Sequence, residues 1–235
     1  MSVKELKRAA GYYAAEWVPS GVVIGLGSGS TARYATLRIA ERLAEGSLRD
    51  VLAVPTSEET AQLARQVGIP LTTLDEQAAI EITIDGADEV DPHLNVIKGH
   101  GGFLLREKIV AYATRHEVII VDEGKLVGRL GERFAVPVEV VRFGWKATWA
   151  ALERTGASVS LRRKAGQPYV TDEGHYILDC AYASIPDPRG LECALNTIPG
   201  VVENGLFVDM VAKVVVAGAA GVRVLERPPA RSGEA

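Results

Sequence analysis

Short apolar runs that alternate with helical patterns constrain the fold of this chain more than any other feature of its sequence. Runs of strand length lie at 22–26 (VVIGL), 52–55 (LAVP), 80–84 (IEITI) and 118–121 (VIIV). Strands that are apolar throughout and alternate with helices are typical of a parallel sheet covered by helices on both faces. The sequence therefore predicts an α/β fold built on such a sheet.

Helices are predicted between these runs from the spacing of the apolar residues. The helix predicted at 3–17 has one apolar face, made of Val3, Leu6, Ala10, Tyr13, Ala14 and Trp17. A second helix follows Thr31. Thr56 and Glu59 fit a capping box, which would open a third helix. A fourth helix is predicted from about 102 to 115.

The pattern changes near Gly131. Residues 136–142 (VPVEVVR) alternate, which predicts a sheet with one solvated face. Further strands are expected at 157–162 and 175–180, and further helices at 145–155 and after Pro188. The last strand-like runs, at 206–208, 213–217 and 222–225, are expected to return to the first sheet. We therefore predict a larger domain from residues 1–130 with 207–227, a small α+β domain at 131–206, and a flexible tail at 228–235.

Composition and charge exclude several classes of function. The 235 residues carry a formal net charge of −4, so no general basic field is available to hold nucleic acid or an anionic membrane. The first ten residues are not a secretory signal, and the apolar stretch 214–221 is far too short to span a bilayer. The only two cysteines, Cys180 and Cys193, form no CxxC pair, which argues against a disulfide framework and a structural zinc site. These features predict a cytoplasmic protein.

Four polar or glycine-rich segments each follow an apolar run directly. They are GSGST after 22–26, DGADE after 80–84, KGHGG after an extended segment at 94–97, and DEGK after 118–121. In an open parallel sheet, ligands bind outside the carboxyl ends of the strands. If the four runs are parallel neighbours, the four segments converge on one crevice.

The first segment, GLGSGST at 25–31, is a glycine-rich turn from a strand into a helix. Ser30 stands where the third glycine of a dinucleotide fingerprint would be, and no GK[ST] closes a P-loop. Backbone N–H groups, the helix dipole and three hydroxyls suit one phosphate group. Capping of the helix by Ser30 or Thr31 explains one hydroxyl but leaves the glycines unexplained. We therefore favour phosphate binding, with Lys125 as a counter-cation.

The second segment places three carboxylates, Asp85, Asp88 and Glu89, within five residues. Such a cluster can hold a hard metal ion, form a solvated turn, or perform acid–base chemistry on sugar hydroxyls. The residues alone do not choose among these three interpretations.

The third segment combines Lys98 at a strand end with a helix that carries Glu107 between Arg106 and Lys108. Periodicity alone favours a solvated helix surface for Glu107. A role in chemistry needs further support.

Together these motifs resemble the A-type ribose-5-phosphate isomerases. The matching stretches are GLGSGST, DGADE, KGHGG…REKI at 98–109, DEGKLV around Lys125, PVEVV at 137–141 and IPGVVENGLF at 198–207. The similarity runs from ELK at 5–7 to about residue 226. Ser28 stands where the family usually has threonine, and His100 and Leu105 stand where small or hydroxylated residues are common.

The resemblance implies a Rossmann-like parallel-sheet domain with a smaller α+β domain inserted near the C-terminus. It also implies interconversion of D-ribose 5-phosphate and D-ribulose 5-phosphate in the pentose phosphate pathway, without metal or other cofactor. The protein would be a homodimer or a dimer of dimers.

By motif, the resemblance gives Glu107 the role of general base, with Lys98 and Asp85 also catalytic. The expected substrate contacts are Ser28, Gly29, Ser30, Thr31, Asp85, Gly86, Ala87, Asp88, Lys98, Gly99, His100, Gly101 and Lys125.

Other functions on a similar architecture are a sugar-phosphate deaminase, a CoA transferase or a sugar-phosphate sensor domain. The combination of DGAD with KGxGG…REK resembles the isomerases specifically. A sensor would need an attached DNA-binding module, for which the chain has no spare length before the first strand, and Ser30 disfavours a nicotinamide dehydrogenase.

Overall fold

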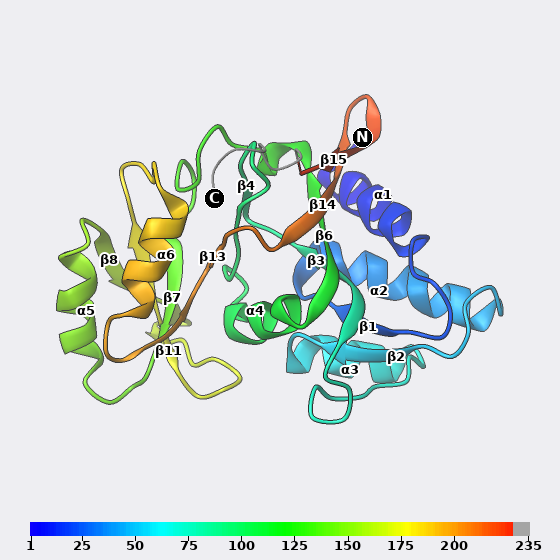
Figure 1. Cartoon of the computed structure of the whole chain (residues 1–235), viewed down its shortest axis with the longest axis horizontal. Coiled ribbons are helices and arrows are strands. Elements are labelled where there is room, and N and C mark those ends of the chain that lie inside the picture. Colours follow the sequence, from blue (N-terminus) through cyan, green and yellow to red (C-terminus); the bar gives the residue numbers. More distant parts are fainter. Residues whose placement is uncertain (228–235) are drawn as a thin grey trace, which may run out of the picture.

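A six-stranded sheet forms the centre of the larger part of the molecule (Figure 1). The computed structural model describes residues 1–227. The strand order is β15-β14-β6-β3-β1-β2, and all neighbours are parallel except the pair β14 and β15. The strands are β1 (Val23–Leu26), β2 (Leu52–Pro55), β3 (Ile80–Gly86), β6 (Thr114–Asp122), β14 (Val211–Gly218) and β15 (Gly221–Glu226). The predicted parallel α/β sheet is confirmed.

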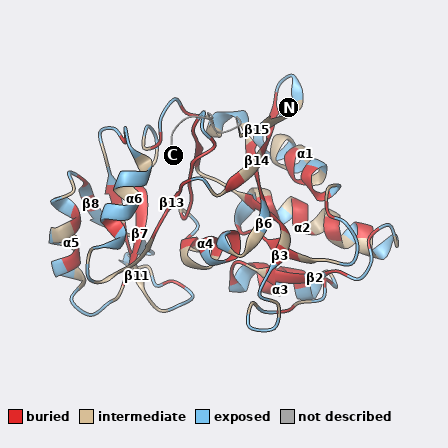
Figure 2. Cartoon of the chain, in the orientation of Figure 1, coloured by how far each residue is buried: buried red, intermediate tan, exposed pale blue. Residues whose placement is uncertain are grey.

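Helices cover both faces of this sheet. They are α1 (Val3–Ala15), α2 (Gly29–Ala44), α3 (Glu58–Gln66) and α4 (Leu104–Tyr112). Ala14 of α1 and Ile39 of α2 pack with Ile82 in one apolar core, whereas Ala111 of α4 packs with Ile119 on the opposite face. The strands are accordingly buried, while the outward sides of the helices are exposed (Figure 2).

A second sheet lies apart from the first and is antiparallel, in the order β12-β7-β11-β8 (Figure 1). Its strands are β7 (Val136–Val140), β8 (Ser158–Leu161), β11 (Tyr176–Ala181) and β12 (Val201–Asn204), and its helices are α5 (Trp145–Glu153) and α6 (Pro188–Asn196). A separate core joins Val138, Leu152, Leu178 and Leu195. The boundaries of the two domains remain a prediction. The division of the strands between two separate sheets supports it.

The predicted solvated face of 136–142 is wrong for β7, whose residues are all buried. One face of β7 packs in the core of α5 and α6. On the other face the Glu139 carboxylate accepts a hydrogen bond from Thr171 Oγ1 at 2.8 Å and contacts the His175 ring at 3.0 Å. A turn covers this face, so the alternation of residue types does not indicate exposure.

A three-stranded ribbon joins the two parts. It consists of β4 (Glu89–Val90), β5 (Val96–Ile97) and β13 (Leu206–Phe207), paired antiparallel in the order β13-β5-β4. The condition that all four runs are parallel neighbours is therefore not met by 94–97, which pairs antiparallel in this ribbon. The segment is too short to cross the sheet, and Leu94, with a φ of 61°, turns the chain back on β4.

Two local predictions also differ from the structure. Ser57, not Thr56, caps α3 and accepts a hydrogen bond from the Thr60 N–H at 3.0 Å. Helix α4 ends at Tyr112 because Thr114 already belongs to β6. Two shorter elements are the hairpin of β9 (Arg163–Lys164) with β10 (Gln167–Pro168) and the turn η1 (Glu123–Lys125).

The buried face of α1 is also different from the predicted one. Val3 and Tyr13 are exposed, and the buried residues are Ala10, Gly11, Ala14 and Ala15. A Cβ atom at Gly11 would lie 2.8 Å from the Ala35 backbone nitrogen. Helices α1 and α2 therefore approach through small residues, which hydrophobicity alone does not identify.

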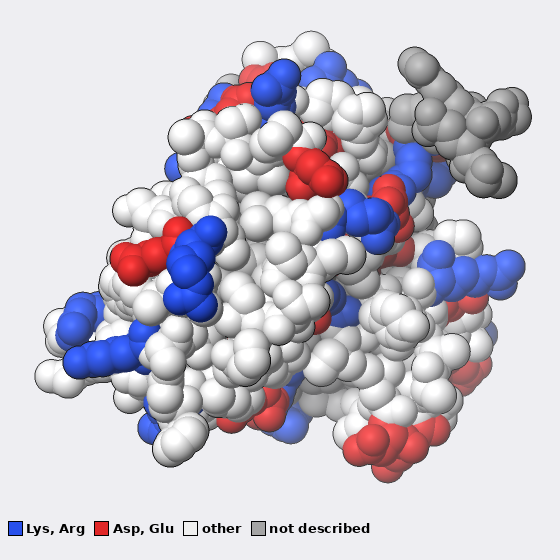
Figure 3. All heavy atoms as spheres, turned by 60° about the vertical axis from the view of Figure 1, so that its left-hand side comes forward, with Lys and Arg blue, Asp and Glu red and all other residues white. Residues whose placement is uncertain are grey.

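Charges of both signs are interspersed on the face drawn in Figure 3, without a broad basic surface there. Within residues 1–227, no helix combines the length and the apolar character that crossing a bilayer requires. The predicted tail at 228–235 lies outside the described residues.

Candidate active site

A pocket of about 110 Å³ opens where the carboxyl ends of β1 and β3 face the start of α2 and the loop after β5. Its lining contains all the predicted site residues except Asp85 and His100, and adds Lys7. The lining residues are Lys7, Ser28, Gly29, Ser30, Thr31, Gly86, Ala87, Asp88, Lys98, Gly99, Gly101, Glu107 and Lys125. Segments that are far apart in the sequence thus meet at the edge expected of an open parallel sheet.

The Lys98 ammonium lies at the inner end of this pocket, between two carboxylates. Its Nζ is 3.0 Å from Asp85 Oδ2 and 3.3 Å from Glu107 Oε1, and it donates a hydrogen bond to the Gly86 carbonyl at 2.5 Å. All three side chains are buried, with exposures of 2% for Lys98, 1% for Asp85 and 6% for Glu107. The Glu107 Oε2 atom has no hydrogen-bond partner among residues 1–227.

Burial determines the protonation of these groups. It raises the pKa of Glu107 to about 8, because the Lys98 ammonium, which lowers it, is outweighed by burial and by Asp85. The pKa of Asp85 is raised for the same reason, and Lys98 again opposes the shift. Burial disfavours the Lys98 ammonium, but Asp85 and Glu107 outweigh it, so the pKa of Lys98 is raised as well. The Lys98 ammonium is surrounded by more carboxyl groups than cations, so these carboxyl groups share protons.

Glu117 on β6 belongs to the same electrostatic group. Its exposure is 1%, and neither carboxyl oxygen has a hydrogen-bond partner among residues 1–227. Burial and the nearby Asp85 raise the pKa of Glu117 well above its ordinary value. Burial therefore favours the protonated form of the Glu117 carboxyl, and no motif in the sequence identified this residue.

The solvated position that periodicity favours for Glu107 is wrong, because α4 buries a stripe that contains charged residues. The buried positions are Leu104, Glu107, Lys108, Val110 and Ala111. Arg106 forms ion pairs with Glu58 at 2.8 Å and with Glu173. Lys108 pairs with Glu203 at 2.9 Å. The neighbouring cations are thus neutralised elsewhere, which leaves Lys98 to face Glu107.

The mouth of the pocket gathers hydroxyl and ammonium donors at the N-terminus of α2. Ser30 and Thr31 lie in the first turn of this helix, and Lys125 comes from η1. Lys7 of α1 donates a hydrogen bond to Ser30 Oγ at 2.9 Å. The helix dipole and these cations suit a phosphate group. Our reading of the motifs missed Lys7, although the matched ELK at 5–7 contains it.

Ser28 differs from its neighbours, because its hydroxyl points away from the pocket. Ser28 Oγ lies 2.7 Å from both Thr56 Oγ1 and Ser57 Oγ, and 3.0 Å from Thr60 Oγ1. The Ser28 N–H donates a hydrogen bond to Asp85 Oδ1 at 3.1 Å. The residue therefore ties the turn to α3 through its side chain and to the pocket through its backbone.

The glycine at position 27, in the motif GLGSGST, is explained by the close approach of this turn to the end of β3. A Cβ atom at Gly27 would lie 2.3 Å from Asp85 Oδ1. A side chain at this position would displace the carboxylate that holds Lys98.

The three carboxylates of DGADE diverge. Asp85 faces Lys98, and Asp88 Oδ2 accepts a hydrogen bond from the His100 N–H at 3.0 Å. Glu89 is fully buried and accepts hydrogen bonds from the backbone N–H groups of Gly131, Arg133 and Phe134. Within residues 1–227 no group of three His, Cys, Asp or Glu side chains is arranged to hold a metal ion.

The His100 ring lies outside the pocket lining. Its Nε2 is 3.2 Å from the Ala135 carbonyl oxygen, and its edge meets the Phe134 ring with centroids 4.6 Å apart. Its backbone, in contrast, lies within the loop that lines the pocket.

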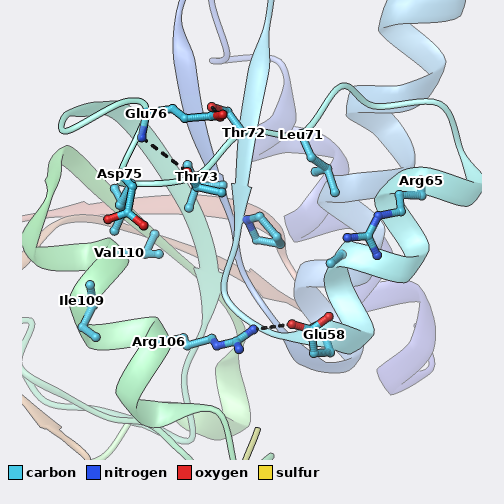
Figure 4. A pocket seen from close by; sticks show the side chains of 14 residues that line it. Glu58, Arg65, Leu71, Thr72, Thr73, Asp75, Glu76, Arg106, Ile109 and Val110 are labelled. Atoms are coloured by element: carbon cyan, nitrogen blue, oxygen red, sulfur yellow. Dashed lines mark hydrogen bonds and ion pairs between the residues drawn. The ribbon is translucent and has the colours of Figure 1, made fainter. Parts of the chain in front are cut away.

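A larger hollow of about 500 Å³ lies between α3, the segment 71–76 and α4 (Figure 4). Its lining is mainly apolar, and its charged side chains include Glu58, Asp75 and Arg106. It contains none of the residues of the Lys98 cluster, so the smaller pocket remains the candidate active site.

Comparisons with known proteins show which family the chain is similar to. The family model of ribose 5-phosphate isomerase A (phosphoriboisomerase A) matches residues 52–221. The ribose-5-phosphate isomerase A of Chloroflexus aurantiacus is 55% identical over 223 residues, which cover 94% of this chain and 93% of that relative.

Solved structures are similar over the same length. A D-ribose-5-phosphate isomerase in complex with phospho-erythronic acid superposes with a TM-score of 0.95 at 42% identity, covering 97% of this chain and 100% of that one. The ribose 5-phosphate isomerase A of Methanocaldococcus jannaschii gives a TM-score of 0.91 at 42% identity, covering 96% and 100%. This chain therefore belongs to the ribose 5-phosphate isomerase A family.

Proposed function

We propose that this protein interconverts D-ribose 5-phosphate and D-ribulose 5-phosphate through an enediol or enediolate intermediate. The observation that carries the proposal is the buried Glu107 carboxyl, 3.3 Å from the Lys98 ammonium, in a pocket that opens onto the start of α2. The names of the related proteins and the phospho-erythronic acid bound to a similar structure support the same reaction.

In the proposed mechanism Glu107 takes a proton from C2 of the open-chain sugar and returns one to C1. A carbon acid is weak, so the base must be held close and must have a pKa near the working pH. A pKa of about 8 meets this requirement far better than the ordinary value of 4.5. The Glu107 Oε2 atom, which has no partner within residues 1–227, is free to accept the proton.

Lys98 stabilises the negative charge that develops on the sugar oxygen. Its ammonium is fixed by Asp85 and by the Gly86 carbonyl, so its positive charge is already in place when the charge on the sugar oxygen appears. A single preorganised donor of this kind contributes about 3–4 kcal/mol in other enzymes.

The phosphate group binds at the mouth of the pocket. Donors there are the N-terminus of α2, the Ser30 and Thr31 hydroxyls, and the ammonium groups of Lys7 and Lys125. The nearly double negative charge of a monophosphate is matched by two lysines and a helix dipole.

The sugar hydroxyls contact the two loops between the phosphate and Lys98. These contacts come from the loop at 85–88 and the loop at 98–101, including the backbone of His100. Asp85, whose raised pKa allows it to carry a proton, helps to open the furanose ring.

The same proposal gives the protein a role in the pentose phosphate pathway, in the cytoplasm, without a cofactor. It acts as a homodimer or a dimer of dimers.

A direct assay tests the proposed function. Purified protein is supplied with ribose 5-phosphate, and the formation of ribulose 5-phosphate is followed with and without a chelator. We expect product in both cases. The absence of product would contradict the assignment, and loss of activity with the chelator would return the carboxylates of DGADE to the metal interpretation.

A further inference from the structure

The loop after β5 is held by a side chain that the proposed mechanism does not use. Arg162 follows β8 of the second sheet, and its Nη1 donates a hydrogen bond to the Gly99 carbonyl at 2.6 Å and to the His100 carbonyl at 3.2 Å. These two carbonyls belong to the loop at 98–102, which carries Lys98 at its start and leads into α4 with Glu107.

Asp179 on β11 fixes the orientation of the Arg162 guanidinium. Arg162 Nε donates a hydrogen bond to Asp179 Oδ2 at 3.0 Å, and Nη2 donates to Oδ1. The side chains are 13% and 20% exposed, so solvent screens this pair only partly. A bidentate pair fixes the plane of the guanidinium as well as its position, which a lysine could not do. The remaining Nη1 donor is thereby directed at the loop.

The loop is also held by residues that directly precede strands β4 and β13 of the ribbon. The His100 N–H donates a hydrogen bond to Asp88 at 3.0 Å, and the Lys98 N–H donates one to the Gly205 carbonyl at 2.9 Å. Arg162 therefore completes a set of contacts that holds the loop.

The backbone of the loop leaves little room for another path. Gly99 and Gly102 have φ values of 103° and 94°, a region that side-chain-bearing residues rarely adopt. The Tyr169 ring packs against Gly102, where an added Cβ atom would lie 2.2 Å from the tyrosine oxygen. Arg162 and Tyr169 lie directly before and after the hairpin of β9 and β10. One short stretch of chain therefore contacts the loop at 98–102 near both of its ends.

We propose that Arg162, oriented by Asp179, is a positioning residue for the isomerase reaction. This inference rests on the proposed function. Arg162 does not touch the substrate; it fixes the Gly99 and His100 peptide groups and, through them, Lys98 and the start of α4. Misplacement of a reacting group by about 1 Å can lower turnover by about 100-fold, so such a contact has kinetic consequences.

The test compares Arg162→Gln with Arg163→Gln. Arg163 is the next residue along the chain, is exposed, and donates a hydrogen bond to Gly166 within its own hairpin, so it is a matched control. In Arg162→Gln we expect kcat to fall by about 10- to 100-fold. Inhibition by inorganic phosphate should stay at the wild-type value, because the phosphate donors lie on α1, α2 and η1. Arg163→Gln should resemble the wild type in both measurements.

Two further measurements separate positioning from general destabilisation. Asp179→Asn keeps the shape of the pair and removes its charge, so it should lower kcat in the same direction but less, and Arg162→Lys should recover part of the loss. Amide hydrogen exchange at residues 99–102 should become faster in Arg162→Gln and not in Arg163→Gln.

Wild-type kcat in Arg162→Gln would overturn the inference, as would a matching loss in Arg163→Gln or an equal loss of phosphate affinity. If Arg162→Gln does not fold, the same criteria apply to Asp179→Asn. Failure of the wild type to isomerise ribose 5-phosphate would contradict the proposed function instead, and the exchange comparison would still decide whether Arg162 holds the loop.

Discussion

At the scale of single residues, the pocket depends on one ammonium group shared by several buried carboxyl groups. Lys98 contacts Asp85 and Glu107 directly, and Glu117 lies in the same field. A buried carboxylate without compensation is costly, so part of this cluster holds protons near neutral pH. The arrangement keeps Lys98 charged and raises the pKa of Glu107 to about 8, which suits the role of base that we propose for it.

The pKa of Glu107 predicts how activity depends on pH. A base works only when deprotonated, so kcat/KM should rise with pH through an apparent pKa near 8, which belongs to the coupled cluster. Lys98→Met should move this rise to higher pH, because the ammonium lowers the pKa of Glu107. A pH–rate profile of both proteins measures this. A wild-type profile that is flat between about pH 7 and 9 would contradict it.

At the scale of elements, the turn between β1 and α2 contains two serines with opposite roles. Ser28 ties the turn to α3, and Ser30 faces the pocket beside Lys7. Both belong to one glycine-rich motif, and the sequence assigns them the same phosphate-binding role.

Alanine substitutions should separate these roles. Ser28→Ala leaves buried hydroxyls without a partner and should lower the free energy of unfolding by about 1–2 kcal/mol, with little change in KM. Ser30→Ala should raise KM for the sugar phosphate and leave the free energy of unfolding nearly unchanged. Urea denaturation and steady-state kinetics on both variants check this pair. A rise of KM in Ser28→Ala alone would reverse the assignment.

The sequence predicts the elements of the main sheet well, because buried parallel strands are apolar throughout. The sequence does not predict the parts of the site that depend on contacts between side chains from distant elements. Lys98 reaches the pocket although β5 belongs to an antiparallel ribbon and not to the main sheet. Glu107 lies on the buried stripe of α4, but a stripe that contains charges has no apolar periodicity. The resemblance to a family, and not the pattern, identified Glu107.

At the scale of the whole molecule, the two sheets contribute differently to one pocket. The six-stranded sheet, its helices and the three-stranded ribbon together supply the pocket and its charged groups, and the four-stranded sheet holds the loop at 98–102 through Arg162. Arg162 and Gly99 are 63 residues apart. Local patterns in the sequence cannot indicate a contact of this range.

The free energy of unfolding of the whole protein should depend on pH because of Glu117, the buried acid on β6. The pKa of Glu117 is higher in the folded than in the unfolded protein, so the folded state binds more protons and loses stability as pH rises above about 4.5. Glu117→Leu removes this penalty and the unsatisfied oxygens, and should raise the free energy of unfolding by about 1–3 kcal/mol near neutral pH. The gain should be smaller at about pH 4. Urea denaturation at both pH values measures it, and a gain that does not depend on pH would contradict this account.

The central claim is that Glu107 transfers the proton, and the turnover of Glu107→Gln tests it most directly. Glutamine keeps the size of the side chain but cannot act as a base, so we predict that kcat falls by about 100- to 10,000-fold. Inhibition by inorganic phosphate should remain at the wild-type value, which shows that the pocket is intact. A variant that isomerises ribose 5-phosphate at nearly the wild-type rate would contradict the account.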